Sequence, residues 1–185
     1  MSDIHMNEDR RHPSFLTIDK LSSSHRVADF RCGKPELDAF ISRYALGHPR
    51  QGLSQTWVAV HDDRVAAYFT LSSAAIANAE ATGRVTKGMP RHDLPAILLA
   101  RLAVDAEFQG QGLGGVVLER ALRRCLRIAE AAHAADPMVL PVRAVLVHAK
   151  DEDAAGFYEH AGFERSPTDP LHLMMLVKDL KRLLT

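Results

Sequence analysis

The feature that most constrains the fold of this chain is a glycine-rich turn between an apolar segment and a long amphipathic segment. Residues Ile97–Val104 are largely apolar, as expected of a central strand that is buried on both faces. The sequence QGQGLG follows at residues 109–114 and opens an amphipathic helix from Leu113 to about Ala132. Amide groups at the start of a helix have no partner within the helix, and glycines let an anion approach them closely. The turn therefore predicts a binding site for a phosphate or pyrophosphate.

Two common phosphate-binding patterns do not fit this turn. The dinucleotide-binding fingerprint has the order GxGxxG, whereas residues 110–115 read GQGLGG. Glu130 has about the right spacing to hold a ribose, but it lies inside the long predicted helix. A P-loop needs a lysine followed by serine or threonine, and this sequence continues with Val116 and Val117. A remaining alternative is a turn whose glycines serve only tight packing.

The order of predicted elements indicates an α/β fold with a mixed sheet flanked by helices. Strands are predicted at Phe15–Leu21, Thr56–Val60, Val65–Ser72, Ile97–Val104, Val142–Val147 and Leu171–Val177. Helices are predicted from Pro35 to Gly47, from Leu113, and over Asp151–His160, with a loop at Asn78–Leu94 and a basic end at Lys178–Leu184. Early hairpins followed by a strand–helix–strand crossover predict a sheet that is antiparallel at one end and parallel at the crossover. We expect one domain over residues 15–185, preceded by a flexible tail at 1–14.

Composition limits the classes of function. The 23 basic and 23 acidic residues cancel, so nucleic-acid binding requires a local cationic patch. The ten histidines show no HxH or HExxH spacing, and Cys32 and Cys125 lie in no metal-binding or disulfide pattern, so no metal site is expected. The sequence contains no apolar run long enough to span a bilayer and no secretory signal pattern, which predicts a cytoplasmic protein without membrane contact.

Two motifs together resemble a known enzyme family. The segment RLAVD at residues 101–105, followed by QGQGLG, resembles the acetyl-CoA-binding motif of the GNAT superfamily of N-acetyltransferases, written Q/R-x-x-G-x-G/A. Gln109, Gly112 and Gly114 occupy its defined positions. The sequence FYEHAGF at residues 157–163 resembles the late helix of the same superfamily. The resemblance implies a GNAT-like acyl-CoA N-acyltransferase fold, an acetyl-CoA-dependent N-acetyltransferase activity, and acetyl-CoA as co-substrate.

The resemblance also implies roles for particular residues. A bulge would separate Leu102, Ala103 and Val104 from the next strand, so that their backbone groups pair with the pantetheine arm. The pyrophosphate would lie on the loop formed by Gln109, Gly110, Gln111, Gly112, Leu113 and Gly114. Tyr158 would act as general acid toward the departing thiolate, and its alternative role is packing beside Phe157 and Phe163.

Direct attack of the amine on the thioester needs no nucleophilic side chain, and Cys125 is expected to be a buried small hydrophobe. Asp105, Glu107 and His148 lie near the motifs in sequence, but no general base is assigned. A base that acts through solvent would leave no mark on the sequence.

A closer resemblance suggests the acceptor. The segments FRCGKPELD at 30–38, GLSQT at 52–56 and AKDEDA at 149–154 resemble the GNAT toxins of bacterial toxin–antitoxin pairs, over about residues 21–176. This resemblance implies acetylation of the amino group of aminoacyl-tRNA, which blocks translation, together with a ribbon-helix-helix antitoxin and a homodimer. The alternatives are acetylation of a small amine or a protein N-terminus, and a module that binds coenzyme A without turnover.

An arginine stripe is one candidate contact for tRNA. Arg120, Arg123, Arg124 and Arg127 recur at helical spacing on the long predicted helix, roughly opposite its apolar positions. The alternative is an ordinary solvated helix face. The loop from Gly83 to Arg91 is a second candidate, and we include Arg91 in the predicted tRNA contacts.

Overall fold

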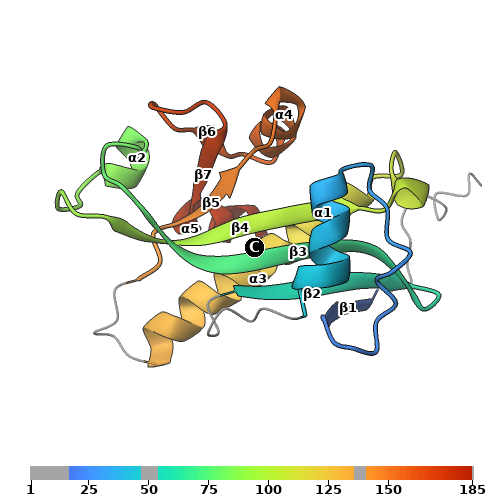
Figure 1. Cartoon of the computed structure of the whole chain (residues 1–185). Helices are drawn as coiled ribbons and strands as arrows, with labels where there is room; N and C mark the ends of the chain where they lie inside the picture. The colour runs from blue at the N-terminus through green and yellow to red at the C-terminus, as the bar shows by residue number, and fades with distance from the viewer. Residues whose placement is uncertain (1–16, 47–53, 136–140, 185) are drawn as a thin grey trace, which may run out of the picture.

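The computed structural model describes residues 17–46, 54–135 and 141–184, so the predicted tail at 1–14 lies outside them. Figure 1 shows a twisted sheet with helices on both faces. The described residues form a seven-stranded sheet with the order β1-β2-β3-β4-β5-β7-β6. Its strands are β1 (Thr17–Lys20), β2 (Ser54–His61), β3 (Arg64–Ile76), β4 (Leu94–Val104), β5 (Ala144–His148), β6 (Glu164–Arg165) and β7 (His172–Leu176). The helices are α1 (Pro35–Ala39), η2 (Phe40–Tyr44), α2 (Gly83–Thr86), η3 (Ala106–Phe108), α3 (Leu113–Ala135), α4 (Glu152–His160) and α5 (Val177–Leu184).

The sheet is mixed, as the element order predicts. Strands β1 to β4 form consecutive antiparallel pairs, and β5, β7 and β6 do the same at the other end. The only parallel pair among the described strands joins β4 to β5, which are connected through α3. A parallel pair needs such a crossover because its two strands run in the same direction.

A bulge in β4 confirms the predicted separation of strands. The register with β3 passes from Thr70 opposite Arg101 to Leu71 opposite Leu99, which leaves Ala100 without a counterpart. The pairing of β4 with β5 ends at Leu99 and Val147, so Arg101–Val104 have no strand partner on that side. The extra residue also changes which side chains face each side of the sheet, because side chains alternate along a strand.

The two faces of the sheet carry different layers (Figure 1). Helix α3 lies across one face, where Leu118, Leu122 and Cys125 are buried against strand residues that include Trp57 and Phe69. Helices α1 and η2 cover part of the other face, where core residues include Phe30, Ile41, Val58, Tyr68 and Ala103. The cofactor motif and the segment FRCGKPELD therefore belong to opposite layers that meet at the sheet.

The helix that begins at Pro35 differs from the prediction. Its second half is a π-helix, in which the Ala45 amide donates to Phe40 O at 2.9 Å, a span of five residues. The wider turn moves later side chains off the apolar stripe that Leu37, Phe40, Ile41, Tyr44 and Ala45 would form on a regular α-helix. Ile41 is buried, but Tyr44 is 50% exposed.

Other differences arise where tertiary packing orders short segments. The predicted loop at 78–94 contains α2, whose N-cap Thr82 accepts a hydrogen bond from Val85 N. The predicted basic end is helix α5, because Leu180 is fully buried in the core beside α3. The expectation that 97–104 is buried on both faces is wrong for five residues that are half-buried because they line cavities, namely Leu98, Ala100, Arg101, Leu102 and Val104. Within the described part of the chain, no helix has the length and apolar character needed to cross a membrane.

Candidate active site

A cleft with a volume of about 670 Å³ opens where β4 and β5 stop pairing. We call it the β4–β5 cleft. One wall is β4 from Leu99 to Val104, which includes the predicted residues Leu102, Ala103 and Val104. The other walls come from the end of β5, the start of α4 and the segment around α1, and they consist of Cys32, Lys34, Glu36, Leu37, Gln109, His148, Ala149, Lys150, Asp151, Ala154 and Tyr158.

The glycine-rich turn has the backbone geometry of an anion site. Gly110 and Gly112 have φ angles of 72° and 80°, which residues with a Cβ rarely adopt. The amides of Gly115 and Val116 donate to Gly112 O at 3.1 and 3.4 Å, so α3 starts at this point. The amides immediately before them have no helical partner and lie at the positive end of the helix dipole. The turn thus fits a pyrophosphate.

The loop side chains have a structural role that the motif did not reveal. Gln109 Nε2 donates to Cys32 O at 3.0 Å and to Val104 O at 2.8 Å, which ties the loop to β4 and to the segment before α1. Gln111 Nε2 donates to Glu107 O at 2.9 Å, and Leu113 is buried in the core. These three side chains have partners within the protein, so only the backbone amides of these residues are available to bind a phosphate.

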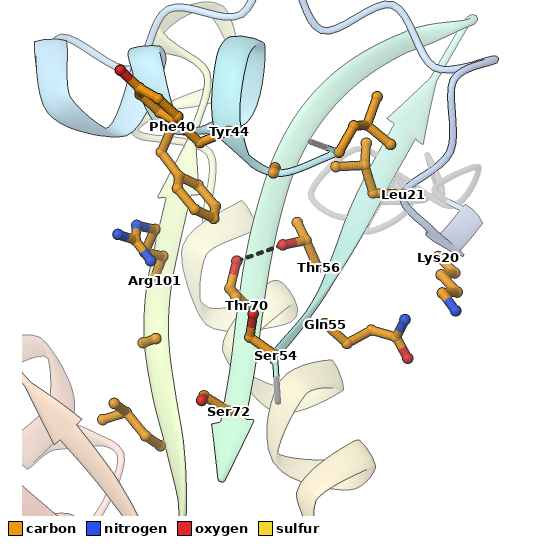
Figure 2. A pocket seen from close by; sticks show the side chains of 14 residues that line it. Lys20, Leu21, Phe40, Tyr44, Ser54, Gln55, Thr56, Thr70, Ser72 and Arg101 are labelled. Atoms are coloured by element: carbon orange, nitrogen blue, oxygen red, sulfur yellow. Dashed lines mark hydrogen bonds between the residues drawn. The ribbon is translucent and has the colours of Figure 1, made fainter. Parts of the chain in front are cut away.

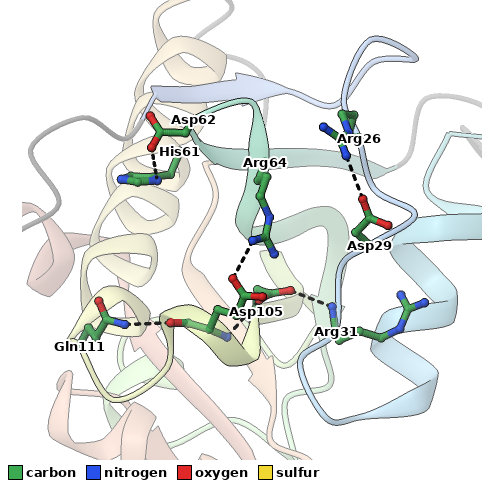
Figure 3. A network of polar contacts seen from close by, with 9 residues as sticks. Arg26, Asp29, Arg31, His61, Asp62, Arg64, Asp105 and Gln111 are labelled. Carbon is green, nitrogen blue, oxygen red and sulfur yellow. Dashed lines mark hydrogen bonds and ion pairs between the residues drawn. The ribbon is translucent and has the colours of Figure 1, made fainter.

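Asp105 organises the entry to this loop, as Figure 3 shows. Its side chain is buried, with 3% of the residue exposed. One carboxylate oxygen accepts from Arg31 N at 2.8 Å, and the other accepts from Glu107 N at 3.1 Å. The Glu107 carboxylate pairs with Arg64 at 2.6 Å. Asp105 and Glu107 thus hold η3 and the α1 segment in place, and the position of Asp105 directly before a short helix is the sequence signal for this cap.

Tyr158 is presented to the cleft by α4. The residue is 8% exposed, and its ring contacts Phe157 and Phe163 edge-on, with centroid distances of 5.3 and 5.6 Å. Among the described residues, none forms a hydrogen bond with its hydroxyl. Burial raises the pKa of Tyr158 to about 12, so the phenol is protonated at neutral pH and can donate a proton. The helix is anchored by its N-cap Asp151, which accepts from Ala154 N at 2.9 Å.

The two thiols are unsuited to covalent catalysis. Burial raises the pKa of Cys32 to about 11 and that of Cys125 to about 12. Both remain thiols at neutral pH, whereas the thiolate is the nucleophile. Cys125 also lies in the core under α3, as predicted. The site therefore favours direct transfer without an acyl-cysteine.

A second pocket, of about 770 Å³, adjoins the cleft and shares Ala100 and Arg101 with it (Figure 2). The Arg101 guanidinium lies over the Phe40 ring at 3.7 Å, and the buried hydroxyls of Thr56 and Thr70 are hydrogen-bonded at 2.8 Å. Its lining consists of Lys20, Leu21, Phe40, Tyr44, Ala45, Leu46, Ser54, Gln55, Thr56, Thr70, Ser72, Leu98, Ala100 and Arg101. This lining has two cations and, among the described residues, no carboxylate.

The predicted arginine contacts lie away from both cavities. Arg120, Arg123 and Arg127 are exposed on α3, on the opposite face of the sheet from α1 (Figure 1). Arg123 pairs with Glu119 at 2.8 Å. Arg124 lies over the Trp57 ring at 4.7 Å, and its pKa is lowered by partial burial and by Arg127. Arg91 is exposed in the turn before β4. Two residues of the second pocket, Lys20 and Arg101, belong to no sequence motif that marks them as part of a site.

In residues 17–46, 54–135 and 141–184 no three His, Cys, Asp or Glu side chains are arranged to hold a metal ion.

Comparison with known proteins agrees with this geometry. Residues 52–165 match the model of the acetyltransferase (GNAT) domain. A tRNA-acetylating toxin from Mycobacterium tuberculosis is 42% identical over 165 residues, which cover 89% of this chain and 94% of that protein. A crystal structure of a KacT mutant has a TM-score of 0.80 at 23% identity and covers 91% of this chain and 98% of that one. A structure of AtaT complexed with acetyl-methionyl-tRNA has a TM-score of 0.78 at 24% identity and covers 92% and 99%. The chain therefore belongs to the GNAT family and is an acetyl-CoA-dependent N-acetyltransferase.

Proposed function

We propose that this enzyme is the toxin of a type II toxin–antitoxin system, and that it acetylates the amino group of aminoacyl-tRNA and so blocks translation. The relative at 42% identity is named a tRNA-acetylating toxin, and it matches over nearly the whole chain. The structural observation that carries the proposal is the second pocket, which opens beside the cleft. Among the described residues, its lining contains two cationic side chains and no carboxylate.

Acetyl-CoA fits the β4–β5 cleft as co-substrate, and it supplies an activated acetyl group. The amides of the glycine-rich turn donate hydrogen bonds to the pyrophosphate at the start of α3. The backbone of Leu102, Ala103 and Val104 has no strand partner on the side of β5, so it can pair with the amides of the pantetheine arm. Ala100 lines both cavities, so the bulge lies where the acetyl end of the bound co-substrate would meet the acceptor in the second pocket.

Tyr158 is the general acid of this proposal. Its protonated hydroxyl faces the cleft from α4, and it delivers a proton to the sulfur as the carbon–sulfur bond breaks. The raised pKa keeps the proton on the phenol at neutral pH until the thiolate forms, because a thiolate attracts the proton more strongly than water does. The rings of Phe157 and Phe163 hold the phenol in position.

The second pocket suits an acceptor that carries negative charge near its amine. Polyamines and other polycations need carboxylates for recognition, whereas Lys20 and Arg101 would repel them. The terminal phosphates of tRNA are attracted by the same two cations. The guanidinium of Arg101 stacks on the Phe40 ring. This contact restricts the Arg101 side chain before a phosphate binds, so the side chain loses less conformational entropy on binding.

The partners implied by this function are proposals of the same kind. We expect a ribbon-helix-helix antitoxin and a homodimer. The exposed Arg120, Arg123 and Arg127 remain candidates for a contact with a more distant part of the tRNA, on the other face of the sheet.

The deciding experiment is incubation of the enzyme with labelled acetyl-CoA and total charged tRNA, in competition with spermidine and an N-terminal peptide. We expect label in the aminoacyl group that is released by mild base, and growth arrest on expression that Tyr158→Phe relieves. Label in spermidine or the peptide, with none in the aminoacyl fraction, would overturn the proposal in favour of a small-amine or protein acetyltransferase.

A further inference from the structure

His148 occupies the point at which the two central strands separate. The last paired residues of β4 and β5 are Leu99 and Val147, so His148 is the first residue beyond the pairing. Its counterpart across the cleft is the bulged segment at Ala100 and Arg101. His148 lines the β4–β5 cleft together with these residues and Tyr158. The imidazole thus lines the cleft together with Ala100 and Arg101, the two residues that also line the second pocket.

Strand alternation defines the side to which His148 points. Val145 and Val147 belong to the core under α3. Leu146, two residues before His148, packs on the opposite side with Ala96 and Met174. Side chains two residues apart share a face, so His148 points away from α3, toward the side of the sheet that holds the second pocket.

The imidazole is held by a neighbouring ring. His148 stands opposite His172 in the β5–β7 ladder, and the two rings stack with a centroid distance of 4.0 Å and an interplanar angle of 21°. His172 Nε2 lies 3.5 Å from a carboxylate oxygen of Asp169. Among the described residues, none forms a hydrogen bond with the ring nitrogens of His148. The ring is therefore oriented by stacking while its nitrogens remain open to a ligand.

We propose that His148 is the general base of the reaction and takes a proton from the acceptor ammonium group before the amine attacks. The proposal rests on the acetylation of aminoacyl-tRNA proposed above. His172 and Asp169 are positioning residues, because the stack sets the direction of the imidazole. The charge of Asp169 also stabilises the imidazolium that forms.

The charges around His148 set its protonation state. The side chain of His148 is exposed, and its partial desolvation and the neighbouring His172 lower its pKa, whereas Asp169 and Glu80 act in the opposite direction. The lower pKa leaves the imidazole neutral at neutral pH, as a base must be. The titratable and charged groups that face it are His172 on β7, Asp169 before β7, Glu80 after β3, Arg101 on β4, and Lys150 and Tyr158 from the β5–α4 side.

Proton transfers through His148 and Tyr158 balance the reaction. The acceptor ammonium loses its first proton to His148, which releases it to water. The neutral nitrogen forms a bond to the acetyl carbon as the carbon–sulfur bond breaks. Tyr158 gives its proton to the sulfur and is reprotonated by the second proton that the nitrogen loses. The products are an amide, a thiol and one proton in solution.

The test is the pH dependence of kcat/KM for aminoacyl-tRNA with the wild type and His148→Gln. A base contributes roughly 100-fold, so we expect the variant to lose roughly 10- to 100-fold near pH 6. It should approach the wild type near pH 9, because the acceptor amine is then already neutral. The acidic limb of the wild type should coincide with the ionisation of His148 followed by NMR, and the affinity for acetyl-CoA measured by calorimetry should be unchanged.

Two further variants separate the roles. His172→Gln should lower kcat by a smaller factor and move the acidic limb of the pH profile to higher pH, because it removes both the stack and the neighbouring charge that lowers the pKa of His148. His160→Gln, on α4 outside the cleft lining, should leave the profile unaltered. An equal loss at every pH in His148→Gln, or no loss, would overturn the role of His148. Failure of the wild type to acetylate aminoacyl-tRNA would instead overturn the proposed function, so the two failures are distinguishable.

Discussion

The β4–β5 cleft and the second pocket meet at Ala100 and Arg101, but they are built in different ways. The cleft has one wall formed by the backbone of β4, which leads directly into the glycine-rich turn, and its other walls come from the α1 segment, the end of β5 and α4. The second pocket uses side chains from β1, β2, β3, β4 and η2, which come together only in the folded chain. If acetyl-CoA and the acceptor bind as proposed, the co-substrate meets a continuous backbone segment along one wall of the cleft, whereas the acceptor meets side chains that only the folded chain brings together.

The two cavities also differ in charge. Lysines on the walls of the cleft have acidic partners, since Lys34 lies 3.9 Å from Asp151 and Lys150 pairs with Glu36. These exposed pairs add little stability, but they link the α1 segment to the start of α4 across the cleft. The second pocket has no described carboxylate to balance Lys20 and Arg101. Changes in the two cavities should therefore have separable effects on co-substrate and acceptor.

The largest expected effect is on chemistry within the cleft. Tyr158→Phe removes the proton donor while retaining the ring that packs against Phe157 and Phe163. We expect kcat to fall by roughly 100- to 1,000-fold, with the calorimetric Kd for acetyl-CoA unchanged. A kcat within a factor of three of the wild type would assign Tyr158 to packing alone.

The next largest effect is on the affinity for acetyl-CoA. Gly112→Asp introduces strain at a φ of 80° and places a negative charge at the turn that is proposed to hold the pyrophosphate. We expect the Kd measured by calorimetry to rise by more than about 30-fold, since strain and charge repulsion each cost roughly 1 to 2 kcal/mol. Gly83→Asp, at the start of α2 and without a positive φ, is the matched control and should bind normally. Equal binding by both variants would contradict the assignment of the turn.

A change at the edge that the second pocket shares with the cleft should affect mainly the acceptor. Arg101→Gln removes the cation at the junction, so KM for aminoacyl-tRNA should rise roughly 10-fold and the salt slope should become shallower. Arg127→Gln on α3 is the matched control on the other face of the sheet and should change KM less. If Arg127→Gln has the larger effect, the main tRNA contact lies along α3 and the comparison of the two cavities needs revision.

A smaller effect is expected on stability. Arg124→Met removes the guanidinium from the Trp57 ring. Loss of this cation–π contact should cost about 1 kcal/mol and lower the Tm by about 3 °C in calorimetry. KM for aminoacyl-tRNA should not change, because Arg124 is engaged with the core. A raised KM for aminoacyl-tRNA at an unchanged Tm would show that Arg124 contacts tRNA.

The smallest effect concerns the alkaline limb of the pH profile. Burial raises the pKa of Tyr158 to about 12, so its phenol stays protonated well above neutral pH. Stopped-flow measurement of kcat should show no fall between about pH 8 and pH 10, where an exposed tyrosine begins to ionise. A decline centred near pH 10 would mean that Tyr158 titrates as an exposed phenol in the working enzyme.

Much of the fold could be predicted from the sequence because its signals are local. The apolar run of β4, the turn with Gly110 and Gly112, and the amphipathic pattern of α3 each act over a few residues. The missed elements are short or depend on partners far away in sequence. Leu180 becomes part of a helix because the core beside α3 buries it, and the π-helix at Phe40–Tyr44 has no signal in propensity.

For the site, residue type alone did not reveal which side chains have partners. Gln109 and Asp105 have hydrogen-bond partners more than 70 residues away, so their structural roles were not visible in the motif. The arginines of α3 have the expected spacing, yet Trp57 and Glu119 engage two of them. Charge patterns predict exposure but not the face of the sheet on which that exposure occurs.

The sequence alone determined the family and located the glycine-rich turn and Tyr158, since these depend on short motifs and on backbone conformations that favour glycine. Only the tertiary structure decided that the bulge at Ala100 joins two cavities, that Lys20 and Arg101 line the second pocket, and that His148 stands at the junction. The physical reason is that strand register and helix placement bring distant side chains together. Register depends on the packing of the whole sheet, not on any one segment.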